Sequence, residues 1–119
     1  MLAIRTGRIP FASGTGSRTV SQMVWFPTQV IRECWVGLGG YSVAYSSGDH
    51  ELKTIETGLR CSIQQTEFGP GAQVVANLFL SDKNSDDAFH GWVDFVLFVE
   101  LDQPLVFDPN LVGGQLELQ

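Results

Sequence analysis

Residues 89–102 read FHGWVDFVLFVELD, and apolar side chains alternate along this stretch with residues of mixed character. Successive side chains of a β-strand point to opposite faces of its sheet, so one face is expected to be wholly apolar: Val93, Phe95, Leu97, Val99 and Leu101. The other face carries Asp94 and Glu100 toward its ends and Val96 and Phe98 in its middle. We therefore expect a central strand with one face on the core and the other partly covered.

The rest of the chain predicts further short strands and no helix. No segment of helical length places apolar residues three and four positions apart. Alternation instead indicates strands at residues 18–26, 29–38, 41–46, 51–57, 59–67 and 72–80. We expect the pair Gly39-Gly40 to turn the chain and Gly58 to separate two strands. The sequence thus predicts an all-β protein, an antiparallel β-sandwich that is jelly-roll-like, with about seven or eight strands.

The length of 119 residues suits one domain, so we expect residues 1–119 to form a single β-sandwich. A chain of this size buries roughly two-thirds of its unfolded surface, which is enough for a core without metal ions or disulfides. Residues 1–17 and 104–119 are expected to be terminal arms or edge strands, because each combines short apolar runs with Gly-rich turns.

The net charge of the chain limits the classes of partner that it is expected to bind. The formal net charge is −6, and no cluster of Lys and Arg offsets it, so phosphate neutralisation gives no affinity and nucleic acid is not an expected partner. No run reaches the ~18 apolar residues of a membrane helix, so no membrane partner is expected. The N-terminal residues lack the apolar segment of a signal peptide, which favours a cytoplasmic location.

The chain has two cysteines, Cys34 and Cys61, each among apolar neighbours in a predicted strand. We expect two buried thiols that behave as small hydrophobic side chains. A disulfide between them is the alternative that the spacing leaves open. Two cysteines without a CxxC spacing give no zinc or redox motif.

An acidic loop precedes the central strand. Asp82, Asn84 and Asp86 lie at alternate positions, as in the first half of a calcium loop, and Asp87 follows them. An EF-hand is excluded. Its sixth position should be glycine and is Asp87 here, and its twelfth should be glutamate and is Val93. Its flanks should be helices, whereas strands are expected here. A calcium site in a loop of the sandwich remains open, and calcium is the possible cofactor. The alternative is a solvated turn capped by Asp and Asn side chains.

A second polar group, Asp49, His50 and Glu51, follows a tight turn. If it shares one end of the sandwich with residues 82–90, these side chains could converge with His90 on a ligand, because imidazole titrates near neutral pH and binds metals. Carbohydrate is the small partner that acidic, aromatic loops suggest by analogy. The alternative is an ordinary surface turn.

The outward face of the central strand predicts an interface. Trp92, Val96 and Phe98 share that face, and Trp25 and Trp35 also fall on the non-core sides of their strands. Large exposed apolar patches are rare on monomers, so we expect a homo-oligomer, with a dimer favoured.

No complete catalytic motif is present, which favours a non-catalytic binding or interaction module that is oligomeric. A ligand or calcium site would lie in loops at one end of the sandwich. Two alternatives remain: a small metal- or His/carboxylate-dependent enzyme, and a purely structural assembly protein.

Overall fold

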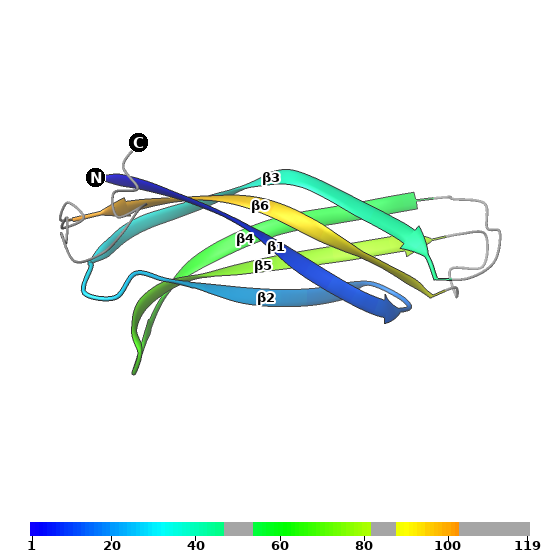
Figure 1. Cartoon of the computed structure of the whole chain (residues 1–119), viewed down its shortest axis with the longest axis horizontal. Coiled ribbons are helices and arrows are strands. Elements are labelled where there is room, and N and C mark those ends of the chain that lie inside the picture. The colour runs from blue at the N-terminus through cyan, green and yellow to red at the C-terminus, as the bar shows by residue number, and fades with distance from the viewer. Residues whose placement is uncertain (47–53, 82–87, 103–119) are drawn as a thin grey trace, which may run out of the picture.

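The computed structural model describes residues 1–46, 54–81 and 88–102, and it is all-β. Its strands are β1 (Leu2–Gly14), β2 (Arg18–Trp25), β3 (Ile31–Tyr45), β4 (Thr54–Thr66), β5 (Gly69–Ser81) and β6 (Phe89–Leu101). They form two three-stranded antiparallel sheets, with the orders β1–β6–β3 and β2–β5–β4. Figure 1 shows the two sheets as two layers whose strands run lengthwise along the molecule. The predicted β-sandwich class is therefore confirmed.

The central strand of each sheet supplies most of the core. β6 lies between β1 and β3, and its inner face is buried from Phe89 to Leu101, as the alternation predicts. β5 lies between β2 and β4, and its inner residues from Ala72 to Leu80 are equally buried. Among the described residues, these two strands hold eleven of the sixteen buried hydrophobic side chains. Burial of each large aliphatic or aromatic side chain contributes roughly 1.5–3 kcal/mol relative to exposure.

The described residues form six strands, not seven or eight, because two glycine signals do not end strands. The chain does not turn at Gly39-Gly40: β3 continues through them, with a bulge between Leu38 and Gly40. A bulge absorbs an extra residue by bending the strand without reversing it. Gly58 lies inside β4, paired with Asn77 of β5. In both cases, pairing with a central strand holds the neighbouring segments in one line. The jelly-roll arrangement stays a prediction.

The two terminal segments were expected to be arms or edge strands. Residues 2–14 form β1, which lies at the edge of its sheet and pairs with β6. Residues 104–119 lie outside the described residues. No helix in the described part of the chain is long and apolar enough to cross a membrane.

The connections β3–β4 and β5–β6 leave from the same end of the sandwich (Figure 1). At that end the amide of Ser46, just after β3, donates to the carbonyl of Ala88, just before β6, at 2.9 Å. The opposite end carries the β2–β3 connection and the β4–β5 hairpin. There the exposed rings of Trp25 and Phe68 contact each other edge to face, with centroids 6.0 Å apart. The fold thus separates a loop end from an aromatic end.

Candidate functional site

Most of the predicted ligand-binding and metal residues lie outside the described residues: Asp49, His50, Glu51, Asp82, Asn84, Asp86 and Asp87. Their roles stay predictions. The strands that flank them do start and finish at one end of the sandwich (Figure 1). His90 is the predicted ligand residue that the structure describes, and it is exposed near the start of β6.

His90 belongs to a small polar cluster at the loop end, which we call the polar cluster and define as Ser13, Ser46 and His90. The Ser46 hydroxyl lies 3.2 Å from His90 Nδ1, and the hydroxyls of Ser13 and Ser46 are 2.5 Å apart. Ser13 comes from β1, Ser46 follows β3 and His90 lies on β6, so the three strands of one sheet bring them together. Two hydroxyls and an exposed imidazole can both donate and accept hydrogen bonds, which suits a polar ligand.

A partly buried cation lies at the loop end beside this cluster. The Arg18 guanidinium, at the start of β2, donates to the carbonyls of Ala12 and Phe89, the latter at 2.7 Å. Its central carbon lies 4.4 Å from the centroid of the Phe89 ring. Partial burial lowers the pKa of Arg18 from its ordinary value, yet an arginine remains charged at neutral pH. Arg18 therefore links the start of β2, in one sheet, to β1 and β6 of the other sheet.

The predicted interface residues Trp92, Val96 and Phe98 lie on the outer face of the β1–β6–β3 sheet, and each is partly buried. The register places Ile4 and Trp35 on either side of Phe98. Trp35 is 48% exposed, so a large aromatic surface is open to solvent there. We call the set Ile4, Trp35, Val96 and Phe98 the apolar patch.

A shallow hollow lies beside the apolar patch. Gly37 of β3 stands opposite Val96, and a Cβ added at Gly37 would meet no atom within 4 Å. The hollow, of about 450 Å³, is lined by residues of all three strands, among them Thr6, Gly39 and Asp94. Gly39 of β3 lines this hollow without a side chain of its own.

The carboxylate of Asp94, on the outer face of β6, is paired within its own sheet. Arg8 donates two hydrogen bonds to Asp94, at 2.7 Å and 3.1 Å. The Arg8 guanidinium carbon also lies 4.3 Å from the centroid of the Trp92 ring, a cation–π contact. The hydrogen bond from Arg8 lowers the pKa of Asp94, so this carboxylate stays ionised and paired at neutral pH.

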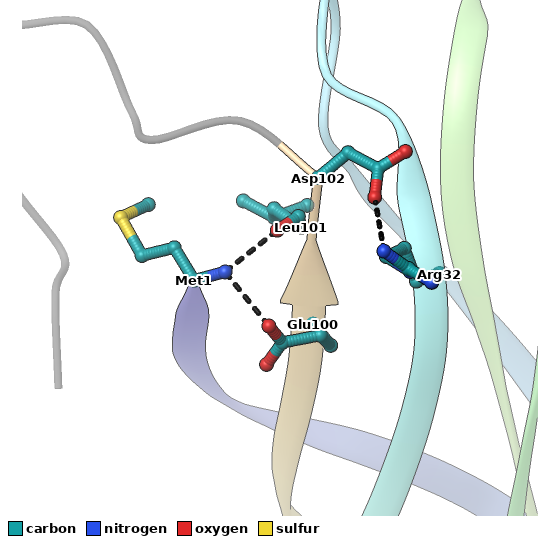
Figure 2. Close-up of polar contacts among 5 residues, drawn as sticks. All are labelled: Met1, Arg32, Glu100, Leu101 and Asp102. Atoms are coloured by element: carbon teal, nitrogen blue, oxygen red, sulfur yellow. Dashed lines mark hydrogen bonds and ion pairs between the residues drawn. The ribbon is translucent and has the colours of Figure 1, made fainter.

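The carboxylate of Glu100, at the other end of β6, is also paired. Figure 2 shows the amino group of Met1 between the Glu100 carboxylate, at 2.8 Å, and the carbonyl of Leu101, at 2.6 Å. Beside them Arg32, near the start of β3, contacts Asp102 at 3.0 Å. These contacts join three strand ends. Both outer-face carboxylates of β6 are therefore paired with a cation of the same sheet.

The described residues contain no group of three or more His, Cys, Asp and Glu side chains that could hold a metal ion. The two cysteines are free thiols, and they are half-buried rather than fully buried as expected. Burial, with a smaller effect from Cys34, raises the pKa of Cys61 to about 12.

Sequence reasoning missed several residues of these sites. Ser13 and Ser46 gave no signal, because single serines near turns are common. Arg8 gave no signal either, because its partner Asp94 lies 86 residues away in the sequence and only the register of β1 and β6 places the two opposite each other. A comparison with protein-family models, curated proteins and solved structures finds no match for this chain.

Proposed function

We propose that the protein is a non-catalytic interaction module that associates with a second copy of itself through the outer face of the β1–β6–β3 sheet. One observation carries the proposal: Trp35, which is 48% exposed, lies directly opposite Phe98 in the register of β3 and β6. Trp is enriched among the residues that dominate interface energies. An aromatic surface of this kind beside Val96 and Ile4 gains most when a partner removes it from water.

The charges of this face suit a second copy. A symmetric dimer uses the same patch on both subunits, so two copies of the patch must not repel each other. The chain is acidic overall, with a formal net charge of −6. Asp94 and Glu100 are nevertheless each paired with a cation of their own subunit. Two copies can therefore approach without placing unpaired carboxylates of β6 against each other.

The hollow beside the apolar patch gives this face a recess that can receive a side chain of the partner. Interface hot spots are large side chains that fill pockets on the partner. The recess lined by Thr6, Gly39 and Asp94 is next to Val96, and its volume of about 450 Å³ has room for such a side chain. In the proposed dimer this recess receives an aromatic side chain of the second copy, while the polar groups of Arg8 and Asp94 form part of the rim.

Phe98→Asp is expected to convert the oligomer into a monomer, because a carboxylate at the centre of the patch would be desolvated without a partner. The matched control is Phe68→Asp, the same substitution at a ring that is 72% exposed on the β4–β5 hairpin. Sedimentation velocity on both variants and the wild-type chain measures the effect. The control should keep the wild-type sedimentation coefficient. An unchanged coefficient for folded Phe98→Asp would reject this face as the interface.

We also propose a ligand-binding role for the loop end, with a polar ligand such as a carbohydrate and with calcium bound by residues 82–87. Support comes from the polar cluster, in which His90 and Ser46 are 3.2 Å apart, and from the common end at which the two connections leave. The proposed compartment is the cytoplasm. A small enzyme that uses His90 as a proton carrier is the alternative that the same cluster favours.

Thermal melts in EDTA, in millimolar calcium and in millimolar zinc test the loop end. A ligand that binds only the native state, at a hundred times its dissociation constant, adds about 2.7 kcal/mol and raises the midpoint by several degrees. We expect calcium to raise the melting midpoint of the wild-type chain. Asp86→Ala should abolish this increase, and His90→Ala should preserve it. A zinc shift lost in His90→Ala would favour the enzyme alternative. The absence of any calcium shift would reject the calcium site.

A further inference from the structure

The two cysteines occupy matching places on the two sheets. Cys34 of β3 pairs with the buried Val99 of β6, and Cys61 of β4 pairs with the buried Val74 of β5. Residues that are directly opposite in an antiparallel pair point to the same face, so both thiols lie on the inner faces of their sheets. β3 and β4 are each at the edge of a sheet. β3 and β4 contact each other along one edge of the sandwich, so both thiols lie on inner faces at this edge, which we call the seam.

Both side chains pack against the hydrophobic core at this edge. Cys34 is near enough to Cys61 to affect the pKa of its thiol. Both thiols are free and only half-buried, so a small reagent can reach them. The chain has no other cysteine. Any disulfide that forms within one chain must therefore join this pair.

We propose that Cys34 and Cys61 are a redox-sensitive modification site, at which a disulfide oxidant such as oxidised glutathione joins the two sheets covalently. In the first step one thiolate attacks the glutathione disulfide, which forms a mixed disulfide and releases one glutathione thiol. In the second step the other cysteine attacks the mixed disulfide and releases the second glutathione. The protein loses two protons and two electrons, and one oxidised glutathione becomes two reduced molecules.

The surroundings of the thiols affect the rate of these steps. Burial, with a smaller effect from Cys34, raises the pKa of Cys61 to about 12, so this thiol reacts slowly at neutral pH. The thiolate is the attacking species, so the rate of crosslinking is expected to rise with pH.

The crosslink would close an open part of the sandwich. Leu38 and Tyr41 of β3 pair with the buried Phe95 and Val93, yet they are 52% and 47% exposed. The inner face is therefore incompletely covered along the β3 edge. A bond between β3 and β4 encloses residues 35–60 in a loop and restricts the unfolded chain, which raises the stability of the native state.

The test is to incubate the native wild-type chain with oxidised glutathione and then to analyse it by intact mass, by non-reducing electrophoresis and by thermal melting. We expect a product of single-chain size that has lost about 2 Da, the mass of two hydrogens, and carries no glutathione. Peptide mapping should find the Cys34–Cys61 bond. The melting midpoint should rise by several degrees and return to its first value after reduction.

The variants Cys34→Ser and Cys61→Ser serve as matched controls, and each should stop at one glutathione adduct without gaining the increase in melting midpoint. If a variant fails to fold, the wild-type experiment still decides. Stable glutathione adducts on the wild-type chain, or disulfide-linked dimers in place of the internal bond, would overturn the proposal. A crosslinked product that melts below the reduced protein would overturn it as well, because the bond would then distort the seam.

Discussion

Phe95→Ala is expected to lower the free energy of unfolding by about 3–5 kcal/mol, the range found when a buried aromatic ring is removed. Phe95 is 2% exposed at the middle of β6, and its ring lies against Gly7 of the neighbouring β1. Gly7 has no side chain that could fill the space left by the ring. A domain of this size is stable by only about 5–15 kcal/mol, so urea denaturation should show a large fall in the midpoint.

Phe68→Ala is the matched control for this prediction. The same atoms are removed from a ring that is 72% exposed, and its main described contact is with Trp25. We expect a loss of less than about 1 kcal/mol, since an aromatic pair at the surface contributes about that amount. Equal losses for the two variants would contradict the assignment of β6 as the strand on which the core is built.

Gly91→Ala should be nearly as damaging, by about 2–3 kcal/mol, although it adds only one methyl group. A Cβ at Gly91 would overlap the backbone carbonyl oxygen of Ser42 on β3. The obstacle is main chain, so relief requires that β3 and β6 move apart and weaken the ladder from Tyr41 to Tyr45. Urea denaturation gives the loss. Hydrogen exchange of the paired amides should be faster in this segment than elsewhere in the sheet.

Gly37→Ala is the control in the neighbouring strand, because a Cβ there meets no atom within 4 Å. Alanine in a strand loses less conformational freedom than glycine, so this change should be neutral or should stabilise by up to about 1 kcal/mol. The two glycine variants are thus expected to differ in sign. A small effect at Gly91 would show that β3 and β6 lie further apart than the structure has them.

The central strands could be predicted because their signal is local. Alternation through β6 placed Val93, Phe95 and Leu97 on the core and left Val96 and Phe98 on a half-covered face, and the structure has them so. Alternation also indicated the strand at residues 72–80, which the structure has within β5. In both strands a fixed period of two residues is enough, since one face of each is fully buried.

Strand length could not be predicted, because it depends on pairing between distant segments. A Gly-Gly pair reads as a turn when only its neighbours are considered. In the fold, residues on both sides of Gly39-Gly40 pair with the same strand, β6, so the chain bulges and continues. The same holds for Gly58, which has paired residues of β5 on either side.

The sites were only partly predictable, for a related reason. The outward aromatic residues follow from alternation, whereas the partners that define their surroundings come from elsewhere in the chain. Arg8 contacts Asp94 and Trp92 across a sheet, and Cys34 and Cys61 lie on the edge strands of two different sheets. Spacing along the sequence carries no record of such contacts, so only the register and the stacking of the sheets show them.

Sedimentation equilibrium of the wild-type chain over a range of concentrations tests the central claim, that the outer face of the β1–β6–β3 sheet binds a second copy. The chain has a mass of 13.1 kDa. We predict an average mass that rises with concentration toward that of two chains, and a Phe98→Asp variant that stays at the mass of one. A wild-type mass of 13.1 kDa at every concentration would contradict the account.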